Sequence, residues 1–252
     1  MGTLKKEQLI LSMPMFTGDA AYSLNRVVED LQSYWGLEVS ELEGDEQIAS
    51  FSIEGESVIL ALMPVPIPST EFENMYSYSY LWPDAEKEIK EHTQHAVVSI
   101  LASESPAVKR YSILSKVNAS ILRTCATAIG VYQGASTLLI AKDIYEDFAD
   151  LLLESVLPIQ LWVYLGILHK GEKTDLYTYG MKEFGKSEME IIDANAESDE
   201  GYDFLLGVLS YILEQDVTLN DGETIGFSEE QKIKITESKA IYLEGNSLKL
   251  EL

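Results

Sequence analysis

Residues 57–103 read SVILALMPVPIPSTEFENMYSYSYLWPDAEKEIKEHTQHAVVSILAS, and this stretch organises the first half of the chain. Val58–Met63 is apolar at every position, which predicts a strand buried on both faces. Pro64, Pro66 and Pro68 follow it. Because proline fixes φ and lacks an N–H, they predict an extended exit from the strand. Such an exit forms either one wall of a cleft or a plain surface connection.

Aromatic residues alternate with smaller ones after the prolines. If residues 75–82 are extended, Tyr76, Tyr78, Tyr80 and Trp82 share one face. Such a face suits a ligand or a partner, and it equally suits the covering of an apolar surface. Tyr80 and Trp82 are therefore candidate binding residues.

Two histidines three residues apart follow the aromatic segment. Pro83 predicts the start of a short helix that ends near His92, and Ala96–Leu101 predicts the next strand. His92 and His95 are candidate binding residues, and such a pair can supply two metal ligands. The spacing straddles the predicted helix end, so we expect the imidazoles to diverge and to bind no metal. Instead, His92 is expected to cap the helix and His95 to pack beneath Trp82.

Composition and charge limit the classes of partner. The 252 residues are 46% hydrophobic, which is typical of a globular protein, and they carry 42 acidic and 18 basic residues for a net charge of −24. This charge argues against nucleic acid and against an anionic membrane surface. It permits a basic protein partner, or it serves solubility alone. The single cysteine, Cys125, excludes an internal disulfide and favours a cytoplasmic location.

The order of predicted elements indicates an α+β protein. A first strand over Gln8–Met13 begins a β-α-β-β-α-β order in residues 1–104, which is the ferredoxin-like pattern. Residues 105–128 predict a long connecting helix that begins at Pro106. Residues 129–252 repeat the order, with a long strand expected over Ile159–Leu168. We therefore predict two ferredoxin-like halves, joined by the helix and packed together.

Two glycine-bracketed loops contribute further candidates. Residues 178–186, TYGMKEFGK, place Met181 and Phe184 after a predicted strand. Residues 221–226, DGETIG, contain Asp221 and Thr224. Both loops read as turns that need a positive φ, and either can also line a binding site. No glycine-rich phosphate loop occurs, and we expect no cofactor.

Five motifs occur along the chain in this order: MPVPIP at 63–68, LWPDA at 81–85, H-x-x-H at 92–95, GMKEFGKSEMEI at 180–191 and DGETIG at 221–226. Together they resemble an uncharacterised bacterial family catalogued as domain of unknown function 4261. The family often carries Trp where Ser69 stands after the prolines, which weakens a ligand role for that position. The resemblance implies a bacterial cytoplasmic protein and implies no activity.

Two functional hypotheses follow from these patterns. The first is a non-enzymatic interaction factor of the immunity or antitoxin type, which masks a basic partner. It rests on the charge of −24 and on the lack of a recognisable catalytic set. The alternative is a small-molecule-binding protein or an enzyme that uses a cleft around Trp82, His92 and His95.

Overall fold

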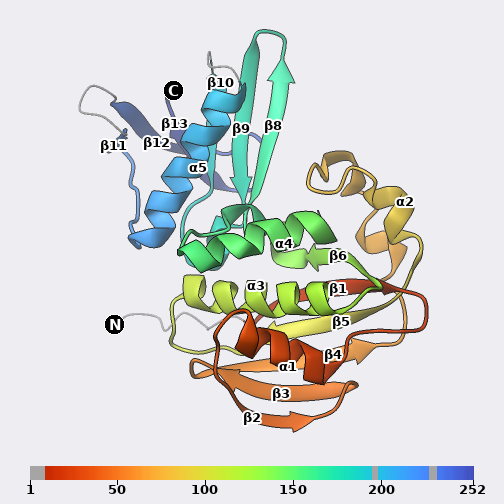
Figure 1. Ribbon diagram of the computed structural model, residues 1–252. Helices are drawn as coiled ribbons and strands as arrows, with labels where there is room; N and C mark the ends of the chain where they lie inside the picture. Colours follow the sequence, from red (N-terminus) through yellow and green to blue (C-terminus); the bar gives the residue numbers. More distant parts are fainter. Residues whose placement is uncertain (1–8, 195–197, 227–231) are drawn as a thin grey trace. The chain divides into compact units, whose positions relative to one another are not determined.

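The structure is a computed structural model that describes residues 9–194, 198–226 and 232–252 (Figure 1). Gln8, where the first strand was expected to begin, lies outside the described residues. The chain divides into two units, Met1–Leu161 and Trp162–Leu252, called unit 1 and unit 2 below. Each unit contains one sheet and at least one helix, so the predicted α+β class is confirmed. No helix among the described residues is both long and apolar enough to cross a bilayer.

Unit 1 is built on a seven-stranded sheet in the order β2-β3-β4-β5-β1-β6-β7, with every pairing antiparallel. The predicted central strand is confirmed as β4, although its outward side is only half-buried. The elements are β1 (Ile10–Thr17), α1 (Leu24–Ser33), β2 (Val39–Gly44), β3 (Ile48–Ile53), β4 (Glu56–Met63), α2 (Ala85–Ile89), β5 (His92–Ile100), α3 (Ala107–Thr124), β6 (Ala128–Gln133), β7 (Leu138–Ala141) and α4 (Lys142–Asp150).

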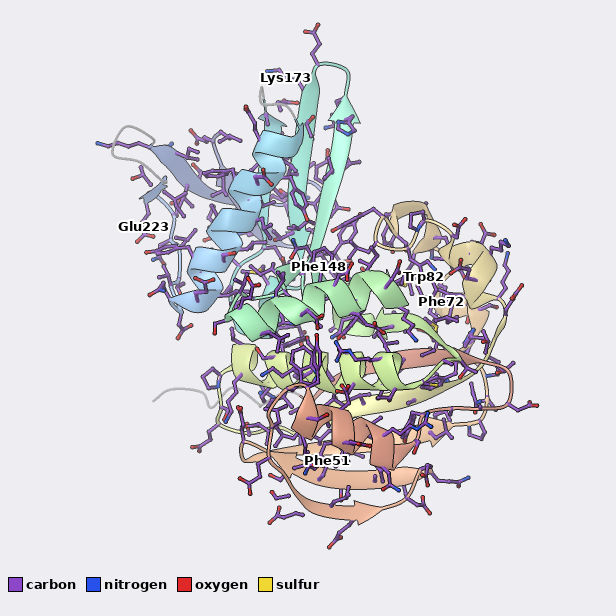
Figure 2. The ribbon with its side chains drawn as sticks, viewed as in Figure 1. Phe51, Phe72, Trp82, Phe148, Lys173 and Glu223 are labelled. Atoms are coloured by element: carbon purple, nitrogen blue, oxygen red, sulfur yellow. The ribbon has the colours of Figure 1, made fainter. Side chains whose placement is uncertain are left out.

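The two faces of this sheet are covered by different parts of unit 1. Helix α3 packs against β1 and β5, with α1 and α4 beside it (Figure 1). Side chains alternate across β1, so Ser12 faces α3 while Met15 faces the opposite side. On that opposite side the segment between β4 and β5 folds over the sheet, with Phe72 and Trp82 close together (Figure 2). The buried cluster comprises Met15, Ile67, Phe72, Met75, Trp82, Ala85, Ile89, Tyr132 and Leu139.

The strand order of unit 1 does not confirm a ferredoxin-like half. In that pattern the first strand lies between the third and the fourth, whereas here β5 lies between β4 and β1. The connection explains the difference, because α2 is only five residues long and β5 returns as the direct antiparallel neighbour of β4. In addition, β6 and β7 extend this sheet. The boundary between the units at 161/162 therefore comes later than the predicted connecting helix at 105–128.

Unit 2 is built on a six-stranded sheet in the order β11-β12-β13-β10-β9-β8. Its pairings are antiparallel except for β10 with β13, and a ferredoxin-like order is not confirmed here either. The strand predicted over Ile159–Leu168 begins only at Tyr164, because Ile159–Leu161 forms a 3₁₀ turn. The elements are β8 (Tyr164–Lys170), β9 (Lys173–Tyr179), β10 (Met189–Ala194), α5 (Ser198–Glu214), β11 (Thr224–Ile225), β12 (Ile233–Lys239) and β13 (Asn246–Leu250).

Candidate functional site

The histidine pair lies on β5, and its geometry corrects the prediction. Alternation along a regular strand would send side chains three residues apart to opposite faces. However, His95 pairs with Met15, and His92 pairs with Thr17, so Thr93 is an extra residue on β5. This β-bulge shifts the alternation by one residue and brings both imidazoles to the face that carries Met15. The expected divergence of the two rings is therefore wrong.

Both imidazoles bind the proline-rich segment that leaves β4. Ile67 donates its N–H to His92 Nε2 over 2.8 Å, and His95 Nδ1 contacts the Val65 carbonyl at 2.9 Å. His92 Nδ1 also contacts the carbonyl of Ile89, so His92 caps α2 as predicted. Burial lowers the pKa of His95 below its ordinary value, against the effect of its bond to Val65. The two rings therefore fasten the proline-rich segment to β5.

The remaining aromatic candidates of unit 1 do not form one face. Tyr76–Tyr78 is a 3₁₀ turn and not an extended strand, so the alternation of side chains is lost. Tyr80 is 41% exposed, whereas Trp82 is buried and donates its indole N–H to Glu88 over 2.8 Å. The indole also occupies the space beside Gly130, where a Cβ would meet the ring at 2.4 Å. Trp82 is thus a core residue of unit 1.

A small pocket of about 340 Å³ lies in unit 1 next to Glu88, the residue that accepts the indole N–H of Trp82. Glu88, Lys142, Asp143 and Glu146 supply its polar lining. Burial raises the pKa of Glu146, and its Oε1 is buried without a hydrogen-bond partner among the described residues. Lys142 donates to the Cys125 carbonyl at 2.9 Å and is thereby held by the backbone.

The loop between β9 and β10 in unit 2 is closed over a buried carboxylate. Glu188 accepts hydrogen bonds from the Thr178 hydroxyl at 2.8 Å and from the Gly180 N–H at 2.9 Å. Met181 is fully buried, and the Phe184 ring stacks on Trp162 at 5.8 Å. Met181 is therefore a core residue of unit 2, Phe184 is half-buried against Trp162, and the loop is a turn organised by Glu188.

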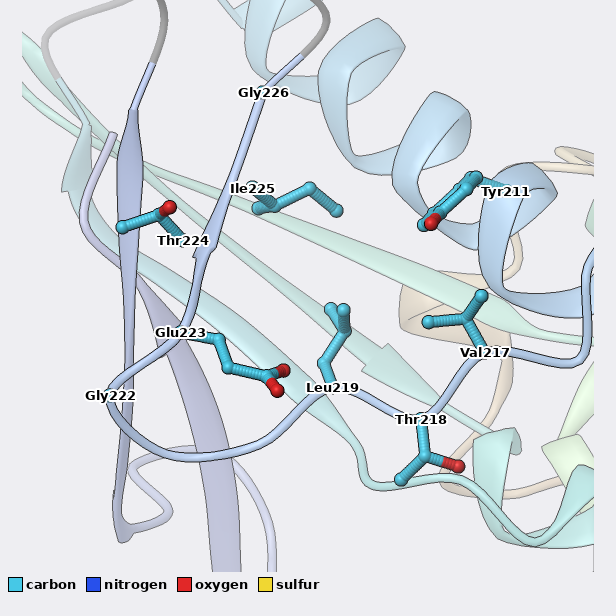
Figure 3. A pocket seen from close by; sticks show the side chains of 9 residues that line it. All are labelled: Tyr211, Val217, Thr218, Leu219, Gly222, Glu223, Thr224, Ile225 and Gly226. Atoms are coloured by element: carbon cyan, nitrogen blue, oxygen red, sulfur yellow. The ribbon is translucent and has the colours of Figure 1, made fainter.

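The second glycine-bracketed loop does border a pocket, with a volume of about 740 Å³ (Figure 3). Ile225 and Glu223 project from one side toward Leu219 and Val217, while Thr224 points to the other side of β11. Asp221 is not in the lining, because its carboxylate accepts from the Glu237 N–H at 2.8 Å. The pocket is lined by Tyr211, Val217, Thr218, Leu219, Gly222, Glu223, Thr224, Ile225 and Gly226.

Sequence reasoning found one wall of this pocket and missed the other. The DGETIG motif marked residues 221–226 because glycines and an Asp cluster in it. Tyr211 gave no comparable signal, since it lies on the exposed side of α5 with 45% of its surface accessible. Val217 and Leu219 are single apolar residues in a loop, which have no periodicity.

A second polar group of unit 2 lies on the face of the sheet opposite α5. Asp175 and Glu190 are fully buried there. Burial raises the pKa of each carboxyl, but hydrogen bonds outweigh it and hold both pKa values below their ordinary range. The donors to Asp175 are Lys170, Tyr242 and the Asp193 N–H, and those to Glu190 are Lys249, Ser247 and the N–H groups of Ile241 and Tyr242.

These buried carboxylates are saturated with donors and do not form a metal centre. Across residues 9–194, 198–226 and 232–252, no three His, Cys, Asp or Glu side chains gather as metal ligands would. The arrangement instead ties the loop between β12 and β13 to the centre of the sheet, because Glu190 binds the backbone of Ile241 and Tyr242. Its chemistry is structural.

Acidic side chains dominate the surface of unit 1 around the β2–β3 hairpin. Residues 27–86 contain 13 Asp or Glu residues and no Lys or Arg. Among the described strands, β2 lies at the edge of the sheet and pairs with β3 alone. Five exposed carboxylates at this edge form no ion pair with any other described residue, and we call them the hairpin acids: Glu38, Glu41, Glu43, Asp45 and Glu46.

The comparisons with known proteins reach only part of the chain. Residues 177–251, from β9 to β13, match the model of a family described as a domain of unknown function, DUF4261. This match confirms the resemblance for the motifs at 180–191 and 221–226, and the pocket of unit 2 lies within it. No curated protein and no solved structure matches the chain.

Proposed function

We propose that this chain, which carries a DUF4261 match in unit 2, is a non-enzymatic binding protein that masks a basic partner protein. The observation that carries the proposal is the run of residues 27–86, where 13 acidic residues stand without one Lys or Arg. Within this run, the five exposed hairpin acids lie together at one sheet edge. Like charges gathered in this way produce a field that attracts and orients a basic protein before contact.

The hairpin acids are the centre of this proposed surface. They lie at an open sheet edge, where their charges are solvent-exposed and are not neutralised by another described residue. Some cations are paired within the chain: Arg123 pairs with Asp30 and Asp150, and Lys249 pairs with Glu190. The excess of negative charge therefore remains on the surface.

Acidic residues at an edge strand also have a purely protective role. Charges and β-bulges discourage one sheet edge from pairing with another, and β2 has a bulge at Glu41, whose φ is 52°. Protection predicts no affinity for a basic chain, whereas masking does. Binding measurements therefore separate the two roles.

The alternative use of Trp82, His92 and His95 as a ligand site has less support. All three side chains are buried, and each has a polar atom bound to another part of unit 1. A ligand at this place would have to replace bonds that already hold residues 65–67 and α2. The histidine pair is better explained as the fastening of the proline-rich segment.

The test measures association of the full chain with a fluorescent oligolysine peptide by stopped-flow. We expect the association rate constant to fall about tenfold or more between ionic strengths of about 0.01 M and 0.15 M, because the Debye length shortens from about 30 to about 8 Å. A triple variant with Glu38→Gln, Glu43→Gln and Glu46→Gln should associate more slowly at low salt.

The matched control removes the same charge from other places. It combines Glu154→Gln, Glu172→Gln and Glu244→Gln, three exposed residues without an ion pair among the described residues. The control should keep a clearly faster association than the hairpin triple variant. Equal slowing in the two triple variants would show that net charge alone acts, and absence of oligolysine binding would refute the proposal.

A further inference from the structure

The geometry points to an anchoring site for one lysine or arginine side chain of the partner in the pocket of unit 2. This inference rests on the proposed function and names a second place where a basic chain is held. The pocket is formed by Tyr211 at the end of α5, by the loop 217–223 and by β11 (Figure 3).

The walls of the pocket suit the aliphatic stem of a basic side chain. Val217, Leu219 and Ile225 extend into the same space between α5 and β11 (Figure 3). Lysine and arginine bury their methylene groups on such apolar surfaces while their charged ends stay at a polar rim. The exposed Tyr211 ring adds a π face, which attracts a cation at its surface.

The rim of the pocket selects a positive charge. Among the described residues that line the pocket, Glu223 alone is charged, and its carboxylate points toward Leu219 (Figure 3). Its two oxygens accept from the Asn220 N–H at 2.8 Å and from the Asn220 amide at 3.2 Å, which holds the carboxylate in place. A carboxylate has about four acceptor positions, so both oxygens can still accept from a cation.

The surroundings oppose an anionic ligand. Glu214 and Asp221 are exposed near the pocket in sequence, and they add negative charge to that of Glu223. One cation is close, since Lys186 Nζ lies 3.4 Å from the hydroxyl of the lining residue Thr218. Its charge is already matched by Asp216 at 2.6 Å. The net field at the pocket therefore favours an amine or a guanidinium.

The test uses the full chain with ¹³C-labelled methyl groups and short peptides of blocked Gly-Gly-X-Gly-Gly. With lysine or arginine at X, the methyl signals of Val217, Leu219 and Ile225 should shift on titration. With acetyl-lysine or norleucine, which keep a stem and lack the charge, binding should be at least about fivefold weaker, which corresponds to about 1 kcal/mol.

Two variants assign the effect to the pocket, and one variant is the control. Glu223→Gln keeps one acceptor for Asn220 and should weaken the lysine peptide about threefold, typical of a partly exposed ion pair. Tyr211→Leu keeps apolar bulk and removes the π face, and it should also weaken binding. Glu172→Gln removes one exposed charge of unit 2 outside the lining and should leave binding unchanged. Melting temperatures identify any variant that is destabilised.

The outcomes separate this inference from the proposed function. If norleucine binds as well as lysine, the pocket is merely apolar and the anchoring site is refuted. If oligolysine binds the chain but Glu223→Gln and Tyr211→Leu bind it as tightly as the unchanged protein, the proposed function stands and the anchor fails. If oligolysine does not bind at all while the lysine peptide shifts the three methyl signals, the masking proposal fails and the pocket remains.

Discussion

The two units bury their polar side chains in different ways. In unit 1 the polar groups beside α3 are mostly neutral, and Asn118 bridges Ser12 and Tyr145 over 2.7–3.0 Å. One buried carboxylate, Glu56, also lies there and accepts from the Ser103 hydroxyl at 2.6 Å. On the opposite face, the imidazoles of His92 and His95 bind the backbone of residues 65–67. In unit 2 the sheet face opposite α5 instead contains the fully buried carboxylates Asp175 and Glu190. Neutral networks lose one hydrogen bond when a member is removed, whereas a buried charge network leaves an uncompensated ion.

The largest expected effect of a single substitution is therefore in unit 2. Glu190→Ala leaves Lys249 and the N–H groups of Ile241 and Tyr242 without their acceptor. Breaking a buried ion pair in this way typically costs about 3–5 kcal/mol of unfolding free energy. Urea unfolding of the full chain measures the loss. Glu172→Ala, an exposed residue of the same unit, is the control, and an equal effect in both variants would contradict the contrast between buried and exposed charge.

A smaller effect is expected from removal of the His92 ring in unit 1. His92→Ala removes the acceptor for the Ile67 N–H and the ring that contacts the Ile89 carbonyl. Unsatisfied buried groups of this kind lower the unfolding free energy by about 2 kcal/mol. Hydrogen exchange should locate the loosening at residues 65–67 and α2. Protection there that matches the unchanged protein would show that the ring does not fasten the segment.

The sheet face with His95 in unit 1 and the sheet face with Asp175 and Glu190 in unit 2 should also respond to acid in different ranges. Burial lowers the pKa of His95 in the folded state, so the unfolded chain binds more protons below its ordinary pKa of about 6.5. Unit 1 therefore loses stability as the pH falls from about 6.5 toward the folded pKa. The carboxyl pKa values of Asp175 and Glu190 are also lowered, so their contribution is complete above about 4.5 and is lost below it.

Hydrogen exchange at several pH values, corrected for the intrinsic rate, separates these responses. Between about pH 7 and pH 5, protection should fall in β5 and stay constant in β10. His95→Gln removes the titrating group and should abolish the change in β5. An equal loss of protection in both strands over this range would show that His95 is not the group responsible.

The smallest effect is expected from ion pairs at the surface. Lys90 and Glu86 lie four residues apart around α2, 2.9 Å from each other, and both side chains are more than 60% exposed. Solvent and salt screen such pairs, so Lys90→Gln should leave the melting temperature of the full chain within experimental error. A clear decrease would mean that this exposed pair is coupled to the buried cluster beneath α2.

The strongly periodic segments were predictable from the sequence. The apolar run at Val58–Met63 became β4, and the amphipathic segment after Pro106 became α3. The pattern of apolar residues along each segment specifies these elements, because it matches the side chains that the element buries. The glycine-rich motif at 221–226 likewise predicted a turn, and glycine at 222 does have a φ of 83°.

The arrangement of those elements was decided by contacts between distant residues. No local pattern shows that β5 pairs with both β4 and β1, or that one extra residue at Thr93 aligns His92 with His95. Tyr211 joins the pocket of loop 217–226 in the same way, from a position that looks like ordinary helix surface. Secondary structure follows from short-range periodicity, whereas strand order, bulges and pockets depend on which long-range pairings bury the most surface and leave the fewest polar groups unsatisfied.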